Sequence, residues 1–88
     1  MLYTVLLRPI VKKIIDKLPQ PSRRRILDAL FALREYPLPP GSIKLRDEAG
    51  RFYRIRVGSY RIVYELAHEI RIVTVVRVGH RREVYRGL

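Results

Sequence analysis

A short run of prolines ending in a glycine, Pro37 to Gly41, divides this sequence into two parts with different hydrophobic periods. Before it, apolar residues recur every three or four positions, as on one face of an α-helix. After it, they alternate with polar residues, as along a half-buried β-strand. The sequence therefore favours an α+β fold in which the helices precede most of the strands.

The N-terminal part predicts one strand and two helices. The chain opens on β-forming residues, and Pro9 suits the first position of a helix. We expect Pro19 and Pro21 to close that helix, and Ser22 to cap a second helix that ends near Tyr36. A tight turn between the two would make an αα-hairpin.

The C-terminal part predicts three strands. Residues 53–57 and 60–66 alternate on either side of a two-residue turn signal, Gly58-Ser59, and residues 70–78 are dense in Val and Ile. The expected order of elements is β-α-α-β-β-β. This order predicts an antiparallel sheet with a two-helix hairpin packed on one face.

Charge is the strongest global feature of the chain. Its 88 residues, read as a single domain over 1–88, carry 19 Lys and Arg against 8 Asp and Glu, a net charge of +11. Fifteen of the basic residues are arginines, whose planar guanidinium groups suit phosphate. A thermophile's surface is the alternative explanation. The charge otherwise implies an acidic partner: nucleic acid, an anionic membrane or an acidic protein.

Several classes of protein and site are disfavoured. The chain has no cysteine, which fits a reducing cytoplasm and rules out disulfides and thiolate metal sites. No apolar run approaches the roughly 18–20 residues that span a bilayer, so no membrane association is expected. The acids are scattered and there is no glycine-rich phosphate loop. We therefore expect neither a metal nor a cofactor.

Alternation predicts an arginine-lined face on the hairpin. If Gly58 and Ser59 form the turn, Arg54 and Arg56 share a face with Arg61, and Arg56 lies directly opposite Arg61. Like charges in that position destabilise a sheet. A solvated charged face is the common explanation of such a strand, but three arginines without a carboxylate favour a multivalent anion.

The end of the chain extends this basic region. The side of the sheet on which Arg77 lies depends on the preceding turn, because a three-residue turn puts it on the arginine face and a two-residue turn does not. Residues 79–86 add three arginines, a histidine and a tyrosine, and can fold back beside the hairpin. A frayed basic tail is the alternative, although Val84 and Tyr85 are unexpected in one.

Two blocks of this sequence resemble the RelE toxin family. They are Tyr53-Arg-Ile-Arg-Val-Gly-Ser-Tyr-Arg-Ile-Val-Tyr64 and Val76-Arg-Val-Gly-His-Arg-Arg-Glu-Val-Tyr85. Lys44-Leu45 also fits the family, and the resemblance covers essentially the whole chain. It implies an endoribonuclease that cleaves mRNA in the ribosomal A site without a metal, by attack of the 2′-hydroxyl on the adjacent phosphate.

The resemblance also implies roles for individual residues. Arg61 and Arg81 would hold the phosphate and stabilise its developing charge, and Tyr85 would be the general base. The catalytic set that it implies is Arg54, Arg56, Arg61, Arg81 and Tyr85. Further RNA contacts are expected from Lys44, Arg77, His80, Arg82 and Arg86.

The chain departs from the family at one point. Some members carry lysine where this chain has Arg54 and Arg56, and arginine holds its proton too tightly to be a good general acid. Protonation of the leaving 5′-oxygen is therefore unassigned. His80 is a candidate, and electrostatic stabilisation alone is the alternative.

The resemblance further implies a partner, an acidic RelB-like antitoxin that forms a hetero-oligomer with the toxin. The net charge of +11 makes such a complex physically reasonable. Two other functions stay open. A ParE-like toxin shares the fold but poisons DNA gyrase and is not a nuclease, and a non-catalytic RNA-binding module needs only the basic surface.

Overall fold

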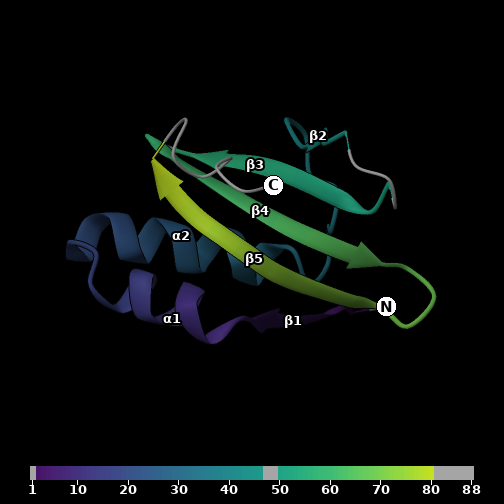
Figure 1. The fold of residues 1–88 in the computed structure, drawn as a ribbon, viewed down its shortest axis with the longest axis horizontal. Helices are drawn as coiled ribbons and strands as arrows, with labels where there is room; N and C mark the ends of the chain where they lie inside the picture. The colour runs from purple at the N-terminus through teal and green to yellow at the C-terminus, as the bar shows by residue number, and fades with distance from the viewer. Residues whose placement is uncertain (1, 47–49, 81–88) are drawn as a thin grey trace.

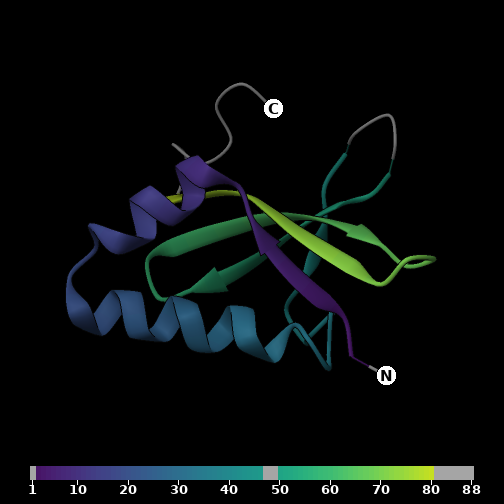
Figure 2. The ribbon, with the colours of Figure 1, turned by 90° about the horizontal axis from the view of Figure 1, so that it is seen from below.

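A five-stranded sheet with two helices on one side forms the architecture of this protein, seen here in a computed structural model that describes residues 2–46 and 50–80 (Figure 1). The helices lie along the same side of the sheet when the molecule is turned by 90° (Figure 2). The elements follow the chain in the order β1 (Thr4–Leu7), α1 (Pro9–Asp16), α2 (Gln20–Ala32), β2 (Ile43–Lys44), β3 (Phe52–Val57), β4 (Tyr60–Ala67) and β5 (Ile72–His80).

The predicted α+β order of elements is confirmed, but the sheet is mixed. Its strand order is β1-β5-β4-β3-β2, and β1 runs parallel to β5, with Thr4 beside Ile72. The expectation of a purely antiparallel sheet was therefore wrong at this edge. Only strands joined by short turns are forced to be antiparallel, and the whole chain between β1 and β5 separates these two. The short edge strand β2 was not predicted either.

The helix boundaries agree with one of the two helix starts predicted from the sequence. Helix α1 begins at Pro9, as predicted. Helix α2 begins at Gln20, with Pro19 as its N-terminal flanking residue and no side-chain cap, so the assignment of Ser22 as the cap was wrong. Pro21 lies in the first turn of α2, where its missing N–H costs nothing, so it helps to start this helix. The helix ends at Ala32, with turns continuing the chain toward Tyr36.

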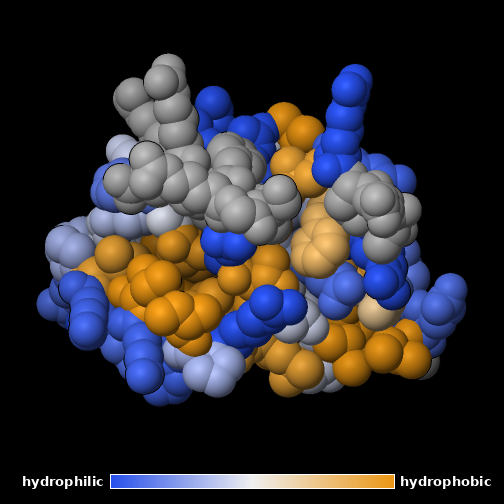
Figure 3. All heavy atoms as spheres, viewed as in Figure 1, coloured by the Kyte–Doolittle hydropathy of each residue, from blue (hydrophilic) through white to orange (hydrophobic). Residues whose placement is uncertain are grey.

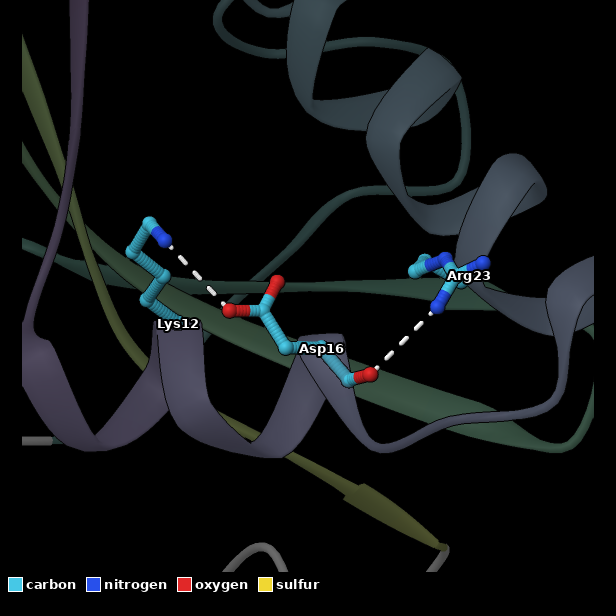
Figure 4. A network of polar contacts seen from close by, with 3 residues as sticks. All are labelled: Lys12, Asp16 and Arg23. Carbon is cyan, nitrogen blue, oxygen red and sulfur yellow. Dashed lines mark hydrogen bonds and ion pairs between the residues drawn. The ribbon is translucent and has the colours of Figure 1, made fainter.

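Polar contacts connect the end of α1 to the start of α2. The Nζ of Lys12 lies 3.3 Å from Oδ2 of Asp16, and a guanidinium nitrogen of Arg23 donates to the backbone oxygen of Asp16 at 3.3 Å (Figure 4). Carbonyl oxygens at a helix C-terminus lack partners within the helix, and a cation there is favourable. The Lys12 contact lies within α1, and the Arg23 contact joins α1 to α2 across the tight turn of the predicted αα-hairpin.

The main core lies between the helices and one face of the sheet. Helix α1 contributes Val11 and Ile15, and α2 contributes Ile26 and Leu30, all of them buried. The sheet contributes buried residues from its three central strands: Ile55, Ile62, Tyr64, Leu66, Val73, Val75 and Val78. Tyr53, Val57 and Tyr60 pack against this cluster, so the predicted apolar face of the hairpin is confirmed.

The buried Tyr64 also anchors the proline segment. Its hydroxyl donates a hydrogen bond of 2.7 Å to the backbone oxygen of Pro37. Burial, and secondarily the neighbouring Tyr53, raises the pKa of Tyr64 to about 12. The contact joins the start of the loop after α2 to the central strand of the sheet.

No helix in the described ranges is long and apolar enough to cross a membrane.

Candidate functional site

The β3–β4 hairpin has the predicted register. Gly58 and Ser59 form the turn, and Gly58 adopts a positive φ of 59° that favours glycine. Arg56 lies directly opposite Arg61, and Arg54 lies opposite Val63. Because directly opposed residues share a face, the three arginines lie on the side of the sheet away from the helices.

A β-bulge decides the position of Arg77. From Ala67 to Tyr64 the β4–β5 pairing is regular, with Tyr64 beside Val75, but the next pair joins Val63 to Arg77. Val76 is therefore the extra residue, and without it Arg77 would fall on the helix side. The turn before β5 spans residues 68–71, so it is longer than both the two-residue and the three-residue turn expected from the sequence.

We call the surface formed by Arg54, Arg56, Arg61 and Arg77 the arginine face. Arg54 and Arg77 flank Val63 from either side, and Arg56 and Gly79 flank Arg61. Gly79 has no side chain, so β5 places no side chain directly beside Arg61. Arg56 is exposed and the other three are half-buried. Four guanidinium groups from three strands thus share one surface.

Electrostatic compensation of Arg56, Arg61 and Arg77 is weak among the described residues. The one described acid on this side of the sheet is Glu65, whose carboxylate lies 3.7 Å from the guanidinium of Arg51. Glu65 lies four residues along β4 from Arg61, about 13 Å at the usual rise. Arg61 makes one weak contact, to the backbone oxygen of Tyr60 at 3.5 Å. A surface of this kind attracts an anion with several acceptor oxygens.

A small apolar cluster underlies the arginine face. Val63 and Val76 are buried there, with Leu45 and Phe52 packed against them. Arginine stems beside such residues can cover apolar surface while the charged ends stay in water. The cluster therefore excludes water from one side of the guanidinium groups, which lowers the local dielectric constant. A lower dielectric constant strengthens the attraction between a guanidinium group and an anion.

Two predicted RNA contacts lie elsewhere. His80 is paired with Tyr60, a residue of the helix side, and their ring centroids are 4.3 Å apart. Lys44 is exposed on the edge strand β2 and is paired with Tyr53, also of the helix side. The structure thus brings neither His80 nor Lys44 to the arginine face.

The remaining predicted site residues lie outside the described part of the chain. They are Arg81, Arg82, Tyr85 and Arg86. The tyrosines of β3 and β4, at positions 53, 60 and 64, all face the helices. Among these, Tyr64 is unsuited to proton transfer because its hydroxyl is already engaged and its pKa is raised. Tyr85 thus stays the predicted general base.

The surface over α1 and β5 has a different character. In the space-filling view, hydrophobic atoms gather there within a hydrophilic surround (Figure 3). A hollow at this place is lined by Ile10, Val11, Ile14, Val76 and Val78, with Arg77 at its margin. The arginine face thus adjoins a partly apolar surface.

Comparison with known proteins identifies the family. The profile of the ParE toxin of the type II toxin–antitoxin system parDE matches residues 5–85. Toxin RelG of Mycobacterium tuberculosis is 33% identical over 85 residues, covering 96% of this chain and 97% of that protein. These matches extend over both halves of the chain.

Solved structures agree with this result. The archaeal RelE–RelB complex from Pyrococcus horikoshii OT3 matches with a TM-score of 0.83 and 29% identity, over 93% of this chain and 98% of that one. The isolated E. coli RelE toxin matches with a TM-score of 0.76 and 30% identity, over 94% and 90%. The chain described here therefore belongs to the RelE/ParE family of toxins of type II toxin–antitoxin systems.

Proposed function

We propose that this RelE-like toxin is a ribosome-dependent endoribonuclease that cleaves mRNA in the A site. The observation that carries the proposal is the arginine face, where Arg56 and Arg61 are paired although like charges in that position cost stability. A multivalent anion such as an RNA backbone would relieve this repulsion. The relatives named RelE and RelG support this reading over a purely structural role.

The proposed chemistry uses the RNA's own 2′-hydroxyl as nucleophile. Tyr85 reacts as its phenolate, favoured by the neighbouring guanidinium groups, and takes the proton of this hydroxyl to become the neutral phenol. The 2′-oxygen bonds to the adjacent phosphorus, and the bond from phosphorus to the 5′-oxygen breaks. The products are a 2′,3′-cyclic phosphate and a 5′-hydroxyl end, the latter protonated by solvent. No step requires a metal, because the substrate supplies the nucleophile and arginines supply positive charge.

The arginines have two separate tasks in this scheme. Arg61, with Arg81, holds the reacting phosphate, where hydrogen-bond donors stabilise the charge that grows in the transition state. Arg54, Arg56 and Arg77 hold the strand by its neighbouring phosphates. Gly79, which is paired with Arg61, has no side chain to compete with the scissile phosphate for contact with Arg61.

In vitro translation tests this proposal. The purified toxin should produce mRNA whose 3′ ends fall within codons, only when ribosomes are present, and cleavage should persist in EDTA once other cations stabilise the ribosomes. Tyr85→Phe should slow cleavage and leave ribosome binding intact. Unchanged cleavage by this variant would remove Tyr85 as the base, and intact mRNA with the wild-type toxin would refute the nuclease.

The ParE-like function is the second candidate, because the matching family profile carries that name. A toxin of this kind would leave mRNA intact and accumulate DNA cleavage complexes with purified gyrase. Running both assays on one preparation distinguishes the two functions. A toxin active in neither, but retained by RNA, would be the non-catalytic RNA-binding module.

We also propose an acidic antitoxin as the partner of this toxin. Two relatives were solved with their antitoxins, in the RelE–RelB complex from P. horikoshii and the toxin–antitoxin complex RelBE2 from M. tuberculosis. The net charge of +11 suits an anionic partner chain that neutralises the arginine face. A small acidic protein encoded beside this gene should co-purify with the toxin and restore growth on co-expression.

A further inference from the structure

A basic hollow, separate from the arginine face, lies at the tip of the β3–β4 hairpin on the helix side of the sheet. Six of its lining residues come from α2, β4, β5 and the hairpin turn, and the hollow measures about 280 Å³. They are Ser22, Arg25, Gly58, Ser59, Tyr60 and His80. No acidic residue among residues 2–46 and 50–80 lines it, and none of these six residues belongs to the arginine face.

The side chains of this hollow are suited to a phosphate. Ser22 and Arg25 are three residues apart on α2 and so lie on the same face of that helix. The guanidinium of Arg25 lies over the hairpin turn, 3.6 Å from the point where a Cβ of Gly58 would stand. The guanidinium and the two serine hydroxyls are hydrogen-bond donors, as phosphate oxygens require.

Arg25 is available for a ligand. It is exposed, and no hydrogen bond or ion pair engages it within residues 2–46 and 50–80. The neighbouring Arg23, by contrast, is engaged with the end of α1. Tyr60 and His80, whose ring centroids lie 4.3 Å apart with the ring planes tilted by 32°, also line the hollow.

The position of the hollow connects it to the arginine face. Val57 and Tyr60 flank the turn on the helix side, and their chain neighbours Arg56 and Arg61 point to the opposite side. The turn itself is only two residues long. An RNA strand bound on the arginine face therefore needs only to pass the hairpin tip to place a further phosphate beside Arg25.

We propose that this hollow is a second subsite for a backbone phosphate of the RNA, separate from the cleavage site. The proposal rests on the proposed function, because it assumes that the arginine face binds RNA. It assigns Arg25 as the principal contact, with Ser22, Ser59 and His80 as supporting donors. These residues hold the strand and take no part in its cleavage.

Binding of a short 2′-O-methyl oligoribonucleotide to the full-length toxin tests the subsite. The methyl group blocks the nucleophile, so the measurement does not depend on cleavage. Arg25→Gln should weaken binding about tenfold, as expected for one charged hydrogen-bonding contact. It should also reduce the slope of log K against log salt by about 0.7, the value for one phosphate of a single strand.

Arg24→Gln is the matched control. It removes the same charge from the next position of α2, is exposed, and does not line the hollow. Glutamine is a good helix former, so both variants should fold. Arg24→Gln should weaken binding by less than about twofold, and equal losses for the two variants would overturn the subsite, since net charge alone would then explain them.

Amide NMR shifts of Gly58 and Ser59 identify the source of the phosphate. The oligoribonucleotide should shift both signals in the wild type and not in Arg25→Gln. Shifts caused by inorganic phosphate but not by the oligoribonucleotide would overturn the proposal in favour of a free-phosphate site. Absence of ribosomal cleavage would refute the nuclease alone, because none of these measurements uses it.

Discussion

The two faces of the sheet are built from alternate residues of the same strands but are opposite in character. The helix side contains fully buried side chains such as Ile62 and Tyr64 and stabilises the fold. The other side carries the arginine face, where Arg56 and Arg61 repel each other across one residue pair. The comparison teaches that one face stabilises the fold, whereas the other carries opposed like charges that cost stability, as suits the anion binding that we propose.

Adjacent residues of β4 test the first half of this comparison. Ile62 faces the main core and Val63 the small cluster under the arginine face, and both are fully buried. Ile62→Ala should lower the free energy of unfolding by about 2–5 kcal/mol, measured by urea denaturation. Val63→Ala should cost less, because fewer methyl groups are removed from a smaller cluster. Equal costs would show that the two faces are equally important to stability.

Arg61→Gln should separate activity from stability. Loss of a transition-state donor is expected to slow ribosome-dependent mRNA cleavage by about 10²–10³-fold, while thermal stability is maintained or raised. Arg51→Gln is the control, because Arg51 is a basic residue at the far end of the same sheet and is paired with Glu65. A similar loss of cleavage in both variants would mean that the position of the charge on this face is unimportant.

Tyr64→Phe tests the polar contact on the helix side. Losing the hydrogen bond to Pro37 should lower the free energy of unfolding by about 1 kcal/mol. In the wild type, burial raises the pKa of Tyr64 from 10.0 to about 12 in the folded state. The folded state therefore holds this proton more tightly than the unfolded one.

The sign of the pH dependence follows from that difference. The contribution of protonated Tyr64 to the free energy of unfolding is fully present below pH 10. It is lost as the pH rises to about 12, and the loss is on the order of 2 kcal/mol in all. Urea denaturation from pH 9 to 12 should show a steeper decline for the wild type than for Tyr64→Phe. Parallel declines would show that Tyr64 is not the residue that titrates.

Arg56→Gln should produce the smallest effect, and in the opposite direction. Removing one of two opposed like charges should raise the free energy of unfolding by a few tenths to about 1 kcal/mol, less at high salt. The same substitution in an Arg61→Gln background should give no gain, which a double-mutant cycle measures. A gain that persists in that background would place the repulsion elsewhere.

The sequence by itself determined most of the fold and three of the four residues of the arginine face, Arg54, Arg56 and Arg61. The change of hydrophobic period at Pro37 separated helices from strands, and Gly58-Ser59 fixed the hairpin register that opposes Arg56 to Arg61. Both signals are local, because periodicity and turn chemistry are properties of neighbouring residues. The family resemblance also came from these blocks of sequence, and the comparisons confirm it.

The tertiary structure alone decided the features that depend on distant residues. One such feature is the parallel pairing of β1 with β5, two strands that no short turn connects. Two others depend on the inserted residue Val76: the position of Arg77 on the arginine face and the pairing of His80 with Tyr60. Since side chains alternate with a period of two, one extra residue reverses every side chain beyond it. That reversal is invisible in the sequence, and it decides that Arg77 lies on the arginine face and His80 on the helix side.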